Sequence, residues 1–248
     1  VKEAGAETRT PLPAIVPPVP ERRIFAAGWT SYALLFGSYA ILTPYLQLFL
    51  GARGFGPSRI GLLLGSFELA GIAGPILVTL LADRLQRYRR FIALSLAGAV
   101  AFFALLHASR SFAAAFPLVI GLGFCYRSAI PLGDALFGRV LHDPSRQYGV
   151  IRVAGSAGFL VVSVVLQLTG WVSGTRPASI LVAFAALAVP AALTAAILPV
   201  VPRLSAPRGA PRPVAIGPAA AGFDARFWTV IAVLFLARFG ISAHYSFF

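Results

Sequence analysis

The sequence is poor in the residue types from which disulfide frameworks and metal sites are built. Its 248 residues include one cysteine, three histidines and eight acidic residues. A single cysteine cannot form an intrachain disulfide, and Cys125 lies inside an apolar stretch, as a buried structural thiol does. We therefore expect no disulfide framework, no metal site and no cofactor.

The scarce histidines also argue against a membrane-embedded enzyme. His107, His142 and His244 fall at span ends, in a loop or in a final apolar segment, without Ser/His/Asp or metal-ligand spacing around them. Such positions are typical of interfacial or structural histidines. We predict that the protein is not an enzyme and has no catalytic residues.

Charge is scarce as well, and apolar residues replace it. Only 12% of the residues are charged and 58% are hydrophobic, with a mean hydropathy of +0.82, more apolar than the surface of a water-soluble domain allows. Runs such as Ile180–Val200 are apolar at almost every position, whereas membrane strands alternate apolar and polar residues. The composition predicts an all-α membrane protein.

Stretches of about 20 apolar residues, the length that crosses the hydrocarbon core, recur between short polar segments. A further span begins near Phe227. The six complete predicted spans are Ile24–Leu50, Ile60–Leu81, Phe91–His107, Phe112–Phe137, Gly149–Val172 and Ile180–Val200.

The spans predict a four-part organisation. Residues 1–22 are Pro-rich and polar without the features of a secretory signal, so we expect a disordered cytoplasmic tail. Residues 23–201 form a six-helix bundle, residues 202–226 a cytoplasmic Pro/Gly-rich linker, and residues 227–248 a seventh helix that is expected to be truncated. Six spans, a basic linker and a further span are the order of two six-helix halves in a parallel repeat. The C-terminal half is then missing and required for function.

The distribution of basic residues predicts the orientation. Fifteen of the 21 Lys and Arg residues lie on one side of the predicted spans, and two lie within spans. We expect a protein of the cytoplasmic (inner) membrane. Since cytoplasmic loops are enriched in Lys and Arg, its N-terminus is expected to lie in the cytoplasm. This bias also accounts for the net charge of +13 through anionic lipid head groups, so no nucleic-acid partner is expected. The four basic residues on the other side are Arg53, Arg59, Arg110 and Arg176.

Ionisable residues inside spans are candidates for function, because each costs about 2.5–3.5 kcal/mol on insertion scales unless it is paired or faces water. Asp134 and Arg152 are each nine residues from Asp143, the centre of the loop between the fourth and fifth spans. Equal spacing puts them at similar depth on adjacent helices, where they can pair and bind a solute. The alternative is a structural clamp between two helices.

A second candidate pair is Glu68 with Arg127. Arg127 lies near mid-membrane, seven residues before Asp134 on the same helical face, and Glu68 lies at a depth from which it reaches Arg127 if their helices face each other. We predict an ion pair that is linked to protons or substrate, or one that only sets helix register. Small residues are expected where helices approach closely, in particular Gly61, Gly65, Ala154, Gly155 and Gly158.

The loop between the second and third spans, LLADRLQRYRR, resembles the signature of the major facilitator superfamily. In that signature an acidic residue at a cytoplasmic helix end is followed by spaced basic residues. Asp83, Arg84 and Arg87 match it, and the resemblance implies a conformational role for this loop. Thr79 and Gln86 depart from it, because the signature has Gly at both positions.

A second resemblance is more specific. GFCYRSAIPLGDALFGRV, QYGVIRVAGSAGF and the early FGSYAILTPYLQLFL are similar to the lactose permease branch, with its nucleoside and phenylpropionate permeases. It implies the N-terminal half of a twelve-helix major facilitator fold, and in lactose permease a carboxylate and an arginine at the positions of Asp134 and Arg152 bind sugar. Here Asp replaces Glu at 134, and Arg127 replaces a neutral residue. An extra arginine suits an anionic solute, so Arg127 joins the substrate-binding candidates.

The favoured hypothesis is a secondary active transporter, a proton symporter of a small organic solute that works by alternating access. Its partners would be the solute, protons and the lipid bilayer. The alternative is a non-transporting scaffold or assembly factor on the same fold, which would not need charges along a cavity. The family's proton-coupling residues lie mainly in the absent half.

Overall fold

A computed structural model describes residues 21–141, 144–197, 228–233 and 236. Within these residues there is no strand, and six helices are long and apolar enough to cross a membrane. Each predicted span corresponds to one of them, so the all-α prediction is confirmed. The helices are α1 (Glu21–Ala52), α2 (Pro57–Leu85), α3 (Tyr88–Ala108), α4 (Phe112–Val140), α5 (Pro144–Thr169) and α6 (Pro177–Ile197).

The predicted tail of residues 1–22 and linker of residues 202–226 lie almost wholly outside the described residues. So does most of the predicted seventh span, of which residues 228–233 are described as helical. The N-terminal compact unit, which ends at Val201, contains all six long helices. The organisation predicted beyond it stays a prediction.

Turn residues separate the helices where the chain must reverse. Gly54 follows α1 with φ of 82°, and Gly170 follows α5 with φ of 56°, a left-handed conformation that glycine adopts without a Cβ penalty. The Ser111 hydroxyl accepts a hydrogen bond from the Ala114 amide at 3.2 Å and so caps the start of α4. Pro57 and Pro177 open α2 and α6, where a missing amide hydrogen does no harm.

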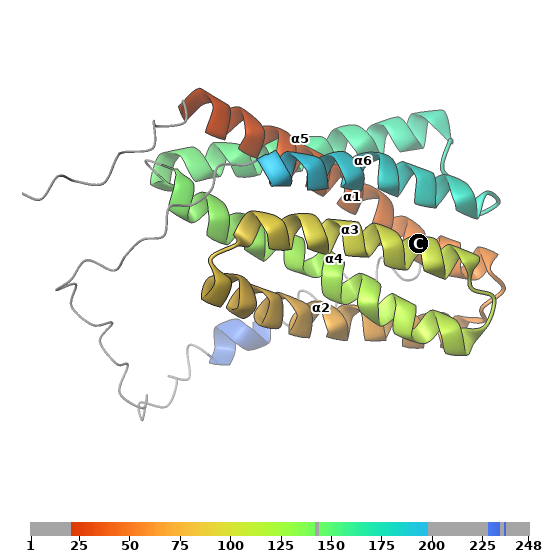
Figure 1. Cartoon of the computed structure of the whole chain (residues 1–248). Coiled ribbons are helices and arrows are strands. Elements are labelled where there is room, and N and C mark those ends of the chain that lie inside the picture. Colours follow the sequence, from red (N-terminus) through yellow and green to blue (C-terminus); the bar gives the residue numbers. More distant parts are fainter. Residues whose placement is uncertain (1–20, 142–143, 198–227, 234–235, 237–248) are drawn as a thin grey trace, which may run out of the picture. The chain divides into compact units, whose positions relative to one another are not determined.

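The helices form two layers of three (Figure 1). One layer holds α2, α4 and α3, and the other holds α5, α1 and α6. In the order of their main contacts, α2 packs on α4, α4 on α3, α3 on α6, α6 on α1, and α1 on α5. Helices that are distant in sequence, such as α1 and α5 or α3 and α6, are therefore neighbours. In the first layer α4 packs on both other helices, and in the second layer α1 does.

Glycines set the closest approaches between helices. A Cβ on Gly158 of α5 would lie 2.2 Å from the Ala33 carbonyl oxygen of α1, and one on Gly123 of α4 would lie 2.4 Å from the Phe67 carbonyl oxygen of α2. Gly158 therefore has the packing role expected for it. The same expectation is wrong for Gly61 and Gly65, because both are exposed and an added Cβ would meet no atom of the described residues within 4 Å.

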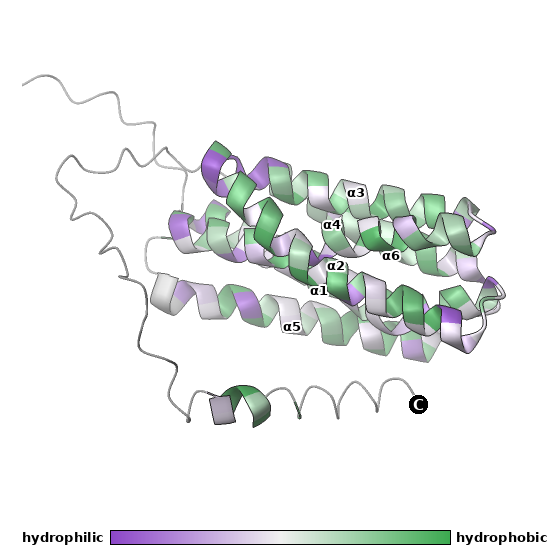
Figure 2. Cartoon of the chain, turned by 90° about the horizontal axis from the view of Figure 1, so that it is seen from below, coloured by the Kyte–Doolittle hydropathy of each residue, from purple (hydrophilic) through white to green (hydrophobic). Residues whose placement is uncertain are grey.

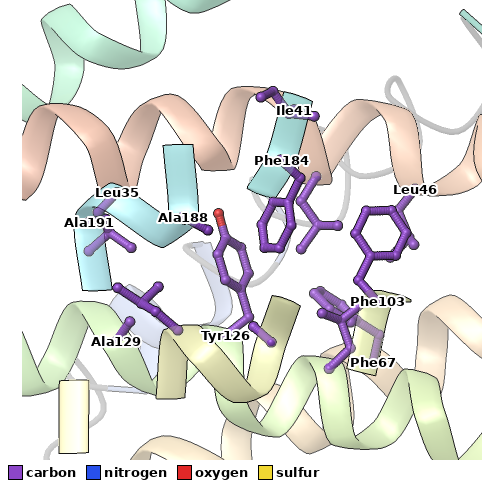
Figure 3. Close-up of a cluster of buried hydrophobic side chains, with 14 of the residues drawn as sticks. Leu35, Ile41, Leu46, Phe67, Phe103, Tyr126, Ala129, Phe184, Ala188 and Ala191 are labelled. Carbon is purple, nitrogen blue, oxygen red and sulfur yellow. The ribbon is translucent and has the colours of Figure 1, made fainter. Parts of the chain in front are cut away.

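Aromatic side chains fill the space between the layers (Figure 3). The Phe184 ring of α6 stands edge-on to Tyr126 of α4, with centroids 5.3 Å apart, and to Phe103 of α3, at 5.5 Å. The buried Tyr126 hydroxyl shares a hydrogen bond of 2.8 Å with Ser38 of α1. This packing fixes α4 against α1 and α6, and it positions the polar residues that follow on α4.

The outward faces of the helices are apolar. Leu69 on α2 is 70% exposed and Leu168 on α5 is 81% exposed, as residues that contact lipid or another helical bundle are. Hydrophobic residues dominate the helix middles and hydrophilic ones gather at the ends (Figure 2). This distribution matches a bundle that lies across a bilayer.

Candidate functional site

Asp134 of α4 and Arg152 of α5 form an ion pair inside the bundle. The Arg152 Nη1 donates to both carboxylate oxygens of Asp134, at 3.0 Å to Oδ1 and 2.9 Å to Oδ2. The side chains keep 33% and 41% of their surface exposed. The contact that spacing predicted is therefore present, and both side chains stay partly accessible.

Two tyrosines hydrogen-bond to this pair, and neither was predicted from the sequence. The Tyr32 hydroxyl of α1 donates to Asp134 Oδ1, and the Tyr148 hydroxyl of α5 accepts from Arg152 Nη1 at 3.2 Å. Tyr148 lies one helical turn before Arg152, a spacing that could have indicated it. Tyr32 is 102 residues from Asp134, and no local pattern links them.

Glu68 of α2 and Arg127 of α4 form the second pair. The Arg127 Nη2 donates to Glu68 Oε1, and the Glu68 side chain is 59% exposed while that of Arg127 is 23% exposed. The Arg127 guanidinium lies over the rings of Phe67, at 5.3 Å, and Tyr39, at 5.9 Å. Among the described residues the buried Arg127 Nε has no hydrogen-bond partner. Arg127 is thus held at one end and has donor capacity left over.

Gly71 gives Arg127 its place against α2. A Cβ on Gly71 would lie 2.7 Å from Arg127 Cγ and 3.3 Å from its Cβ. The aliphatic stem of Arg127 therefore crosses α2 directly over Gly71, one turn beyond Phe67 and Glu68. Only a residue without a side chain leaves room for this path.

We expect Gly71→Ala to displace Arg127 and to weaken binding of a carboxylate ligand, because the methyl group occupies the path of the arginine stem. The purified full-length protein would be titrated with ligand by calorimetry, and we expect an affinity loss of about tenfold, the value of one charge-assisted hydrogen bond. Gly65→Ala on the same helix meets open space and should bind normally. In an Arg127→Ala background Gly71→Ala should have no further effect; an equal loss there would contradict the assignment.

A row of α1 rings joins the two ion pairs. Tyr32 stacks on Phe36 with centroids 5.9 Å apart, and Phe36 lies 6.0 Å from Tyr39. The Arg152 guanidinium is 5.7 Å from the Phe36 centroid, while Arg127 covers Tyr39. Arg127 and Asp134 are two turns apart, about 10 Å along α4. This site, the intramembrane row, offers two charged ends with aromatic surface between them.

The loop between α2 and α3 forms a separate polar cluster. Asp83 accepts hydrogen bonds from the Tyr88 hydroxyl and from Arg139 Nη2 of α4, the latter at 3.0 Å. Gln86 has a positive φ of 52°, the conformation that glycine at this position of the signature would favour. Its Nε2 donates to the Asp83 carbonyl at 2.6 Å, and its Oε1 accepts from Arg139 Nη1 at 3.2 Å. Gln86 therefore adds a link to α4 that glycine lacks.

The predicted loop residues Arg84 and Arg87 are exposed. The basic partner of Asp83 is Arg139, at the end of α4, which sequence reasoning did not single out. Its ring contact with Tyr88, 4.6 Å from guanidinium to centroid, fixes it there. Among described residues there is no group of three His, Cys, Asp or Glu side chains able to hold a metal.

Comparison with known proteins decides the family. Residues 30–248 match the family described as MFS_1-like. The chain belongs to this family of the major facilitator superfamily. It is similar to a probable 3-phenylpropionic acid transporter of Escherichia coli (strain K12), with 32% identity over 155 aligned residues. The aligned region covers 60% of this chain and 38% of that relative.

A solved structure shows the same fold. The crystal structure of the nucleoside transporter NupG has a TM-score of 0.65 and 18% identity, covering 75% of this chain and 47% of that one. The MFS_1-like chain thus spans less than half the length of either protein. With six membrane-length helices, it is an integral multi-pass membrane protein, and the predicted family and fold are confirmed.

Proposed function

We propose that the complete protein is a secondary active transporter of a small organic anion across the cytoplasmic membrane. The observation that carries this proposal is the intramembrane row, in which two arginine–carboxylate pairs on α2, α4 and α5 flank the α1 rings. Ion pairs are costly inside a membrane unless they face a polar cavity. Two partly exposed pairs joined by aromatic surface fit a solute path.

The row favours a solute that carries a carboxylate and a flat ring. Arg127 keeps 23% of its side chain exposed beside Glu68, and a guanidinium binds carboxylate through charge-assisted hydrogen bonds. The partly buried Phe36 and Tyr39 rings give the row an apolar, aromatic lining between its charged ends. The relative named for 3-phenylpropionic acid supports an aromatic carboxylate as the substrate class.

We propose that Glu68 and Arg127 couple solute transport to protons. A proton that binds the exposed Glu68 carboxylate neutralises it and releases Arg127 Nη2, which can then bind the solute carboxylate. When the solute leaves, Glu68 loses the proton and pairs with Arg127 again. Alternating access requires a second six-helix half that closes the cavity from the other side.

Ligand binding tests this function against that of a scaffold. The purified full-length protein should gain thermal stability with 3-phenylpropionate, by about 2.7 kcal/mol at a ligand concentration of 100 Kd. The matched alcohol 3-phenyl-1-propanol, which lacks the carboxylate, should stabilise far less. A scaffold without a solute site would show no difference between the two compounds, and that result would exclude the proposed function.

The proposed orientation places the Asp83 end of the bundle in the cytoplasm. In a Cys125→Ser background, a cysteine introduced by Thr175→Cys should react with an impermeant maleimide added outside intact cells. One introduced by Arg90→Cys, at an exposed site on the opposite end, should react only after the cells are opened. The reverse pattern would show that the bundle is inverted.

A further inference from the structure

A second basic site lies at the end of the bundle remote from Asp83. Three connections meet there: the one after α1, the one after α3 and the one before α6. They border an open hollow of about 330 Å³ that is lined by Ala52, Arg53, Arg110 and Pro177. None of these residues belongs to the intramembrane row.

The hollow is positively charged, and no acidic side chain in the three connections balances its arginines. Residues 53–56, 109–111 and 170–176 include three arginines and no acidic residue. Among the described side chains no carboxylate pairs with Arg53 or Arg110. The first acidic residue of α2, Glu68, lies eleven residues after Pro57, about 16 Å along the helix. Two guanidiniums that share one hollow repel each other unless an anion lies between them.

The hollow is also partly preorganised for an anion. The Arg53 Nη2 donates to the Ser109 carbonyl oxygen, which ties the first connection to the second and holds Arg53 half-buried. Pro177 opens α6, so the positive end of the α6 dipole lies at the rim. Arg110 is exposed beside them.

We propose that this hollow binds a phosphate group between Arg53 and Arg110. A guanidinium presents paired N–H donors that match phosphate oxygens, and two guanidiniums supply enough positive charge to neutralise a phosphate group. The phosphate belongs to a lipid head group in the adjacent leaflet or to free inorganic phosphate, and both present at least two unesterified phosphate oxygens. The site is independent of the proposed transport, since it shares no residue with the intramembrane row.

The test uses the purified full chain in a neutral detergent, titrated with inorganic phosphate against sodium chloride of equal ionic strength. Thermal stability should rise saturably with phosphate. Arg110→Gln should weaken the apparent affinity about tenfold, the equivalent of one charge-assisted hydrogen bond. Arg59→Gln is the matched control, because Arg59 lies at the same end but stacks over Phe112 and does not line the hollow.

A second arm separates the two sources of phosphate. Native mass spectrometry counts the phosphatidylglycerol that the wild type and Arg110→Gln retain from mixed micelles with phosphatidylcholine. If a lipid occupies the hollow, the wild type retains more phosphatidylglycerol than Arg110→Gln, and added phosphate then has no effect. If neither probe distinguishes Arg110→Gln from the wild type, or if Arg59→Gln weakens binding as much, the hollow is not a phosphate site.

Discussion

Asp134→Asn or Arg152→Gln in the full-length protein is expected to reduce 3-phenylpropionate uptake about 30-fold, because removing one partner of this partly exposed charge pair costs about 2 kcal/mol. Each change leaves the other charge without its counter-ion inside the membrane. Asp134→Asn also alters the group that accepts from Tyr32 and Arg152. Uptake would be measured in vesicles that impose a proton gradient, with transporter content normalised by immunoblot.

The controls separate a solute site from a structural clamp. Arg176→Gln removes an exposed arginine outside the row and should leave uptake unchanged. The double variant Asp134→Arg/Arg152→Asp exchanges the two charges and restores an ion pair. If the pair is only a structural clamp, this variant should recover both thermal stability and uptake. A solute site would recover stability alone, because the arginine then faces the solute from α4 rather than α5. Full uptake by the exchanged protein would reject the site assignment.

Arg127→Gln is expected to weaken binding of 3-phenylpropionate about ten- to 100-fold, the range of a charge-assisted hydrogen bond. Gln cannot supply the positive charge that the proposed carboxylate partner needs. Binding of 3-phenyl-1-propanol, which carries no charge, should not change between the wild type and the variant. Calorimetric titration of both compounds measures the difference directly.

Glu68→Gln is the companion variant and should act differently. It keeps Arg127 and its contacts with Phe67 and Tyr39 but removes the group proposed to take the proton. We expect 3-phenylpropionate to bind at least as well as in the wild type, while accumulation against a gradient is lost and exchange of solute continues. If Glu68→Gln and Arg127→Gln lose binding equally and exchange also stops, the pair only fixes helix register.

Much of the site was open to prediction because helices impose regular spacing. The depth of Asp134 and Arg152 followed from their equal distance to the loop between their helices, and the structure places them in contact. Glu68 and Arg127 required an assumption that α2 faces α4, which the structure also shows. The roles of these residues in substrate and proton binding stay predictions.

Other contacts could not be predicted from local pattern. Tyr32 reaches Asp134 across 102 residues and Arg139 reaches Asp83 across 56, and such pairs depend on which helices become neighbours. The same dependence made the expectation for Gly61 and Gly65 wrong, since a small residue permits close packing only where another helix is present.

The sequence by itself determined that the chain crosses a membrane as helices, where those helices lie, and which ionisable residues they carry. These properties follow from apolar run length and from the need of backbone groups in lipid to bond within their own segment. Only the tertiary structure decided the order of packing, the α1 rings between the ion pairs, the place of Gly71 beneath Arg127 and the basic hollow formed by three distant connections. Those features depend on side-chain packing between helices, which becomes specific only when the bundle assembles.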